Sequence, residues 1–146
     1  LFGAVLKINA YSYGLAEAAE ILYQNAGKQD GVDYFMVEKP EEALALRLQS
    51  KIPESVPILI LYRTVMAPSL LCKLALLHIR VSALAIEWLL SLNLNDFCPP
   101  STPALKFHAM LDTGLSREGL RLEETVSHLA DHFYPLEKGI RERKLQ

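Results

Sequence analysis

Short apolar runs alternate with segments of helical periodicity along the whole chain. Five apolar runs predict strands over residues 2–6, 34–37, 57–62, 79–81 and 105–111. Each is followed by a segment that predicts a helix, over residues 15–25, 40–48, 68–77, 83–92 and 121–133. Such alternation predicts parallel strands joined by right-handed helical crossovers, which places the chain in the α/β class.

Local signals mark several helix ends. Pro40 begins its helix with Glu41 and Glu42 in the first turn, where acids suit the helix dipole. Ser82 is the predicted N-cap of the helix over 83–92. The one breaker-rich segment, residues 93–103, reads as a surface loop between units.

Five βα units fit two architectures. One is a flavodoxin-like doubly wound sheet, and the other is a truncated (β/α)8 barrel, since a closed barrel typically takes ~250 residues. The chain opens directly in an apolar run without an initiator Met, which suggests a fragment. We therefore expect one domain over residues 1–146 that does not complete its fold.

Composition narrows the choice of partners and compartment. The chain has 146 residues, 51% of them hydrophobic, and a formal net charge of −2, so it lacks the basic surface that nucleic-acid binding needs. No apolar run reaches the ~20 residues of a membrane span. Cys72 and Cys98 lie far apart, without metal-ligand spacing, and are expected to be reduced thiols in a cytoplasmic protein.

Lys7 is the first candidate for chemistry. It follows the first predicted strand, and active sites of parallel sheets and barrels lie at the carboxyl ends of the strands. Its amine could attack a carbonyl group, and the hydroxyls and backbone N–H groups of residues 11–14 could hold a phosphorylated cofactor. On position alone, the favoured interpretation of Lys7 is a lysine that reaches from a strand end to solvent.

The second candidate region is residues 107–119, "FHAMLDTGLSREG", where a strand leads to Asp112 and then to Arg117. Asp-Thr-Gly occurs in aspartic proteases, but those need a second copy that this chain lacks. His108 is interpreted as a structural histidine. The remaining histidines have no spacing that indicates a metal site.

Taken together, "AVLKINAYSYG" and "HAMLDTGLSREG" resemble the alanine racemase family of pyridoxal-phosphate barrel enzymes. Between them, "DYFMVEKPEEALALR", "VPILIL" and "VSALAIEWL" are similar to the family's second, third and fourth units. The resemblance implies an incomplete (β/α)8-barrel of about five βα units with parallel strands. Residues 1–146 would be the N-terminal cofactor-binding part, with the family's C-terminal β domain absent.

The resemblance also implies a site. Lys7 matches the lysine that forms the internal aldimine with pyridoxal 5'-phosphate and acts as one of two catalytic bases. Tyr11 matches a tyrosine that contacts the cofactor's phosphate. Arg117 matches an arginine near the cofactor's phenolic oxygen and the substrate's carboxylate. The implied activity is conversion of L-alanine to D-alanine for the cell wall, by a cytoplasmic homodimer.

The chain departs from the family in three ways. Met110 stands where the family usually has a lysine that supports the arginine, and Ser12-Tyr13 replaces the usual Gly-His. Third, the chain stops after five units. In the family the second base is a tyrosine from the C-terminal domain of the partner subunit, which the resemblance places well beyond Gln146. Two alternatives therefore stay open, a truncated non-catalytic α/β module and a pyridoxal-phosphate barrel amino-acid decarboxylase.

Overall fold

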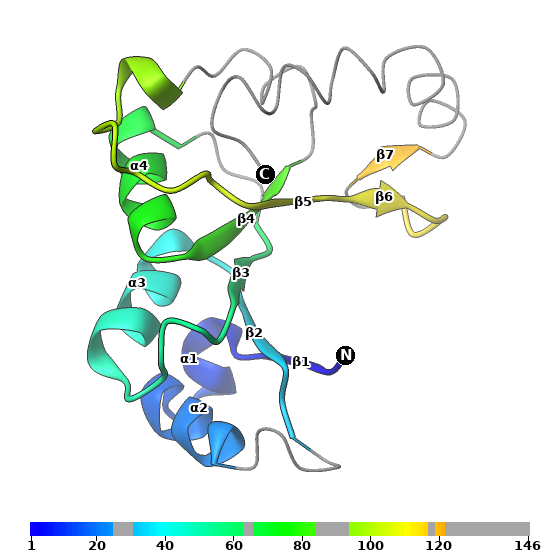
Figure 1. Cartoon of the computed structure of the whole chain (residues 1–146). Helices are drawn as coiled ribbons and strands as arrows, with labels where there is room; N and C mark the ends of the chain where they lie inside the picture. The colour runs from blue at the N-terminus through cyan, green and yellow to red at the C-terminus, as the bar shows by residue number, and fades with distance from the viewer. Residues whose placement is uncertain (25–30, 63–65, 84–93, 117–118, 122–146) are drawn as a thin grey trace.

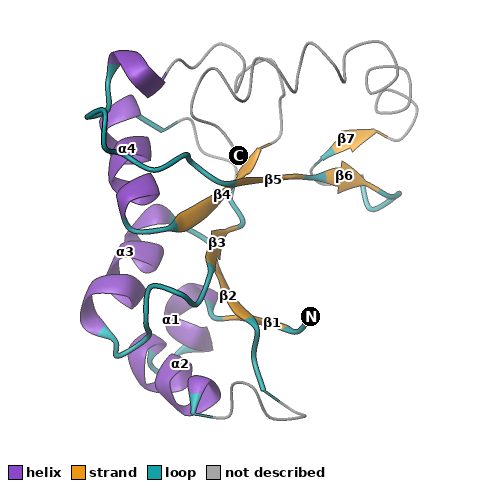
Figure 2. Cartoon of the chain, viewed as in Figure 1, coloured by secondary structure: helices purple, strands orange, loops and turns teal. Residues whose placement is uncertain are grey.

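The computed structural model describes residues 1–24, 31–62, 66–83, 94–116 and 119–121, which form a parallel sheet with helices on one side (Figures 1 and 2). The strands are β1 (Gly3–Val5), β2 (Tyr34–Val37), β3 (Ile58–Ile60), β4 (Ile79–Ala83), β5 (Phe107–Ala109), β6 (Leu111–Asp112) and β7 (Leu120–Arg121). The helices are α1 (Lys7–Tyr11), α2 (Leu15–Tyr23), α3 (Pro40–Gln49) and α4 (Pro68–Leu76), with a 3-10 turn η1 (Leu94–Asp96).

The order of the strands decides between the two architectures. The main sheet runs β1-β2-β3-β4-β5, and every neighbouring pair is parallel. Figure 2 shows the helices together on one side of this sheet. A doubly wound sheet would reverse its strand order and carry helices on both faces, whereas a barrel adds each strand next to the last. The predicted incomplete (β/α)8-type fold is confirmed, with β1 and β5 at the edges of the described sheet.

The core lies between the sheet and the helices. Alternate residues of the central strands face the helices and are fully buried, namely Phe35, Val37, Ile58, Ile60, Ile79 and Val81. The other face of the sheet carries half-buried side chains that include Met36, Arg80 and His108. One face is therefore packed by helices, as in the wall of a barrel.

Two of the predicted helices, α3 and α4, begin where the sequence placed them. Pro40 and Pro68 occupy the first turns of α3 and α4, where the missing proline N–H costs no hydrogen bond. Glu42 accepts the N–H of Lys39 through its side chain at 3.2 Å, which caps the start of α3. The predicted starts of α3 and α4 were thus accurate.

Two predicted helix starts were wrong. Ser82 and Ala83 belong to β4, because their backbone pairs with His108 and Ala109 of β5. Arg121 pairs with Asp112 in the two-stranded β6–β7 sheet. The rest of both predicted helices, residues 84–92 and 122–133, lies outside the described residues. The fifth apolar run also divides, because Met110 separates β5 from β6.

The expectation of reduced thiols was wrong as well. Cys72 of α4 and Cys98, two residues after η1, form a disulfide with their Cα atoms 5.5 Å apart. Both residues are buried, at 6% and 7% exposure. The two cysteines are 26 positions apart in the sequence, and the sequence pattern did not indicate that the segment after η1 packs against α4.

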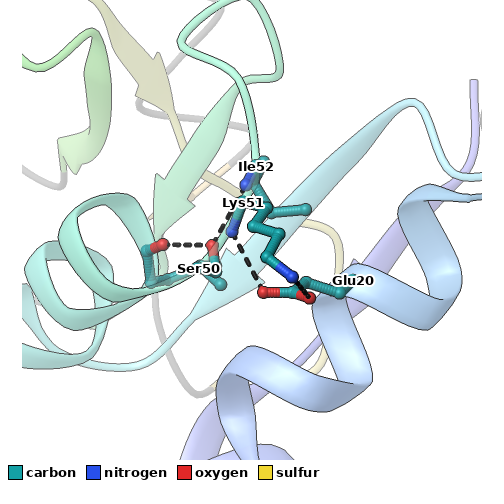
Figure 3. A network of polar contacts seen from close by, with 5 residues as sticks. Glu20, Ser50, Lys51 and Ile52 are labelled. Carbon is teal, nitrogen blue, oxygen red and sulfur yellow. Dashed lines mark hydrogen bonds and ion pairs between the residues drawn. The ribbon is translucent and has the colours of Figure 1, made fainter.

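A polar network joins α2 to the segment that follows α3 (Figure 3). Glu20 accepts the backbone N–H of Lys51 at 3.1 Å and forms an ion pair with its ammonium group at 3.8 Å. The Ser50 hydroxyl donates to the Leu46 carbonyl and accepts the N–H of Ile52. Helix α2 is therefore tied to the segment that follows α3.

Arg47 is a buried cation whose partners are backbone carbonyls. Its guanidinium donates to the carbonyl oxygens of Leu77, Pro53 and Val56 at 3.2, 2.7 and 2.7 Å. Desolvation lowers the pKa of Arg47, and the nearby Glu54 opposes that effect. One side chain thus joins α3 to the segment before β3 and to the end of α4.

We expect Arg47→Met to lower the free energy of unfolding by at least about 2 kcal/mol, because three carbonyls lose a charged donor. Urea unfolding followed by circular dichroism measures this. Lys73→Met, at an exposed position on α4, is the matched control and should change stability by less than about 0.5 kcal/mol. Equal stability of the two variants would contradict the assigned role of Arg47.

Candidate active site at the carboxyl end of the sheet

Lys7 lies directly after the first strand, at the carboxyl edge of the sheet. Leu6 is buried and donates its N–H to the carbonyl oxygen of Met36 at 2.7 Å, so the chain is held to β2 up to the residue before Lys7. Lys7 itself is half-buried. Its ammonium group makes no hydrogen bond or ion pair with any residue that the structure describes. Lys7 therefore follows the carboxyl end of β1, and its amine has no structural partner among the described residues.

The turn after Lys7 has an unusual backbone. Five consecutive residues without a glycine, Ile8 to Ser12, have positive φ angles between 52° and 74°. A left-handed conformation costs about 1–2 kcal/mol per residue for side chains other than glycine. Strain of this kind persists only where surrounding contacts impose it, and it occurs preferentially at functional sites. Sequence reading predicted a turn here without its handedness.

Several hydrogen bonds within the segment hold this turn. Ala10 donates its N–H to the Leu6 carbonyl at 2.9 Å, and Gly14 donates to the Asn9 carbonyl at 3.1 Å. The Asn9 side-chain oxygen accepts the N–H of Leu15 at 2.9 Å, which ties the turn to the start of α2. Gly14 has φ +95°, a region that residues with a Cβ rarely adopt.

The predicted phosphate ligand Tyr11 lies on the same turn as Lys7. Tyr11 ends α1 and is 54% exposed, and Tyr13 is 85% exposed. Ser12 also lies at the surface. Side chains on this turn are thus accessible from solvent.

Sequence reading missed Glu42 as part of the site. One carboxylate oxygen of Glu42 accepts the N–H of Ile8, the residue after Lys7, at 2.6 Å. The other oxygen accepts the N–H groups of Glu38 and Lys39 at 2.8 and 3.2 Å. The sequence showed only an acid in a first helical turn. The signal that could have identified Glu42 was the expected parallel pairing of the first two strands, which places the first turn of α3 beside the end of β1.

In the second candidate region, residues 107–119, Asp112 belongs to β6. One oxygen of Asp112 accepts the N–H groups of Gly114 and Ser116, both at 2.9 Å. These bonds lower the pKa of Asp112, the bond from Ser116 having the larger effect. Arg117 lies outside the described residues, so its place beside Lys7 stays a prediction. Met110, the departure from the family pattern, is half-buried between β5 and β6.

The lowered pKa of Asp112 predicts how the turn over residues 112–116 responds to pH. A depressed carboxyl pKa contributes stability above the unfolded value of about 3.9, and that stability is lost as pH falls through the lower folded value. We expect the Ser116 amide to be protected from hydrogen exchange at neutral pH and to lose protection in acid. Asp112→Asn keeps an acceptor oxygen and should remove the pH dependence. Protection of the Ser116 amide that does not change with pH in the original chain would contradict this prediction.

His108 faces the side of the sheet away from the helices. Arg80 donates to its Nε2 atom at 3.4 Å. Burial lowers the pKa of His108, and the positive charge of Arg80 lowers it further. This favours a neutral imidazole at pH 7, which agrees with a structural histidine. Within the described ranges, no group of His, Cys, Asp and Glu could hold a metal ion, and no helix is long and apolar enough to cross a membrane.

The fold and the position of Lys7 define the class of this chain. It is a βα-barrel protein with a lysine at the carboxyl end of its first strand. The family described as "Alanine racemase, N-terminal domain" matches residues 2–141. The chain belongs to this family.

Individual relatives of the chain are alanine racemases. The chain is 32% identical over 132 residues to alanine racemase from Levilactobacillus brevis, covering 88% of this chain and 33% of the relative. It is 37% identical over 131 residues to the enzyme from Hamiltonella defensa, covering 90% of this chain and 31% of the relative. The chain thus spans about a third of the length of these relatives.

Solved structures show the same fold. Alanine racemase from E. faecalis superimposes with a TM-score of 0.68 at 28% identity, covering 99% of this chain and 34% of that structure. The enzyme from Clostridium difficile 630 gives a TM-score of 0.73 at 23% identity, covering 99% of this chain and 33% of that structure.

Proposed function

We propose that this chain is the N-terminal, cofactor-holding part of a pyridoxal-phosphate-dependent amino-acid racemase that acts on alanine. Lys7 would hold the cofactor and exchange a proton with the substrate. Tyr11 would contact the cofactor's phosphate, and Arg117 would bind near the cofactor and the substrate's carboxylate. The observation that carries the proposal is the amine of Lys7, free of described partners and set on a strained turn at the carboxyl edge.

The residues present fit pyridoxal phosphate. A primary amine is the group that bonds to the cofactor's aldehyde, and Lys7 supplies one at the edge where barrels bind ligands. The turn that follows carries the exposed Tyr11, whose hydroxyl could donate to a phosphate oxygen. Both groups lie on five consecutive residues, so one backbone turn positions both.

Each group has a chemical role in this proposal. When bound, pyridoxal phosphate takes up the electron pair left when the substrate's α-proton is removed. The Lys7 amine accepts or returns that proton on one side of the α-carbon. Arg117 offers a planar, permanently charged donor to the carboxylate. Met110 supplies no charge to support that arginine, so its orientation would depend on other groups.

The proposal extends to the complete protein. The remaining barrel strands and a C-terminal β domain would supply the second base, as part of a homodimer in the cytoplasm. The product would serve D-alanine biosynthesis for the cell wall. In the described part of the sheet, β1 and β5 each have one neighbouring strand, which supports this reading because strand edges are normally covered by further structure.

The experiment is a cofactor titration of the purified chain. Pyridoxal phosphate should produce a new visible absorbance band that saturates at one equivalent and becomes fixed on treatment with borohydride. A barrel decarboxylase would give the same band, so L-alanine and basic amino acids should be compared as ligands that perturb it. No saturable band would refute the proposed function.

A further inference from the structure

We propose that Glu42 is a positioning residue that holds the Lys7 turn in its left-handed conformation. The inference rests on the proposed function for its meaning, because positioning matters only if Lys7 holds the cofactor. Its geometric basis is independent of that function. Glu42 belongs to α3, in the second βα unit, yet it accepts the N–H of Ile8 in the first unit at 2.6 Å.

The carboxylate joins the loops that follow two neighbouring strands. Its other oxygen accepts the N–H groups of Glu38 and Lys39, directly after β2. Because β1 and β2 are parallel neighbours, both loops leave the sheet at the same edge. A single side chain with two acceptor oxygens can therefore fix the start of the Lys7 turn relative to the next unit.

The strain of the turn explains why such an anchor is needed. The hydrogen bonds of Ala10, Ser12 and Gly14 run to partners between Leu6 and Asn9, all within or next to the turn. Ile8 is the first residue with a positive φ, and its N–H is held from outside the turn. Hydrogen bonds to a charged acceptor are stronger than neutral ones, which suits a strained segment. Helix α3 also packs against α2, and the network of Figure 3 joins α2 to the segment that follows α3.

The test compares Glu42→Ala and Glu42→Gln with the control Glu41→Ala, an exposed acid in the same helical turn. Hydrogen exchange of the cofactor-free chain, read at the Ile8 amide, is the first measurement. We expect exchange to accelerate about tenfold or more in Glu42→Ala, because the amide loses a charged acceptor. Glu42→Gln has one acceptor oxygen for two loops, so its Ile8 exchange rate should lie between those of Glu42→Ala and the original chain. The control Glu41→Ala should exchange at the rate of the original chain.

The second measurement is borohydride-fixed labelling of Lys7 by pyridoxal phosphate, normalised to labelling of the exposed Lys51. We expect Glu42→Ala to lower this ratio about tenfold or more, because the Lys7 turn loses the charged acceptor of its Ile8 N–H. The ratio separates this effect from a general loss of fold, which would change the labelling of both lysines. Unchanged Ile8 exchange in both Glu42 variants would overturn the inference. Absence of Lys7 labelling in the original chain, with Ile8 exchange still dependent on Glu42, would refute the proposed function and leave the structural role of Glu42 standing.

Discussion

The 146-residue chain, saturated with pyridoxal phosphate, is expected to interconvert L- and D-alanine about 100- to 10,000-fold more slowly than a complete racemase. Racemisation through two bases needs a proton acceptor on one side of the α-carbon and a donor on the other. Lys7 can serve one side. Under the proposed function, the second base would come from the remaining parts of the complete protein.

A coupled assay for D-amino acids on the purified chain measures this rate, with a full-length racemase assayed in parallel. Addition of separately expressed remaining barrel and C-terminal domain should raise the rate if the second base comes from there. Turnover equal to that of the full-length enzyme, lost on Lys7→Ala, would show that a partial barrel suffices.

Lys7→Ala is expected to abolish the visible band and the borohydride-fixed adduct, because no other described lysine lies at the end of the first strand. Lys51→Ala and Lys73→Ala, at exposed lysines on other segments, are matched controls and should keep both signals. An equally strong band in Lys7→Ala would mean that surface lysines react, and it would refute the assignment of Lys7.

Much of the fold could be predicted because its signals are local. Apolar runs such as residues 34–37 matched their strand, and Pro40 and Pro68 marked helix starts. The errors came from contacts distant in sequence. Ser82 looked like a helix cap, but pairing with β5 keeps it extended. The Cys72–Cys98 disulfide likewise depends on packing that the sequence pattern does not contain.

Only part of the site's geometry could be predicted, and the roles of Lys7, Tyr11 and Arg117 stay predictions. The position of Lys7 follows from one strand end, and the structure places it there. The left-handed turn after it could not be predicted, because Ile8 and Ala10 are residues that normally avoid positive φ. The contact of Glu42 with Ile8 could not be predicted from local sequence, because it forms between two loops that the parallel pairing of β1 and β2 brings together.

The central claim is that the amine of Lys7 holds the cofactor, and mapping the fixed adduct tests it most directly. The chain is incubated with one equivalent of pyridoxal phosphate, reduced with borohydride, digested, and analysed by mass spectrometry. We predict that the pyridoxyl group is found on the peptide that contains Lys7, and that added L-alanine lowers its yield. A pyridoxyl group spread over surface lysines, with Lys7 unmodified, would contradict the account.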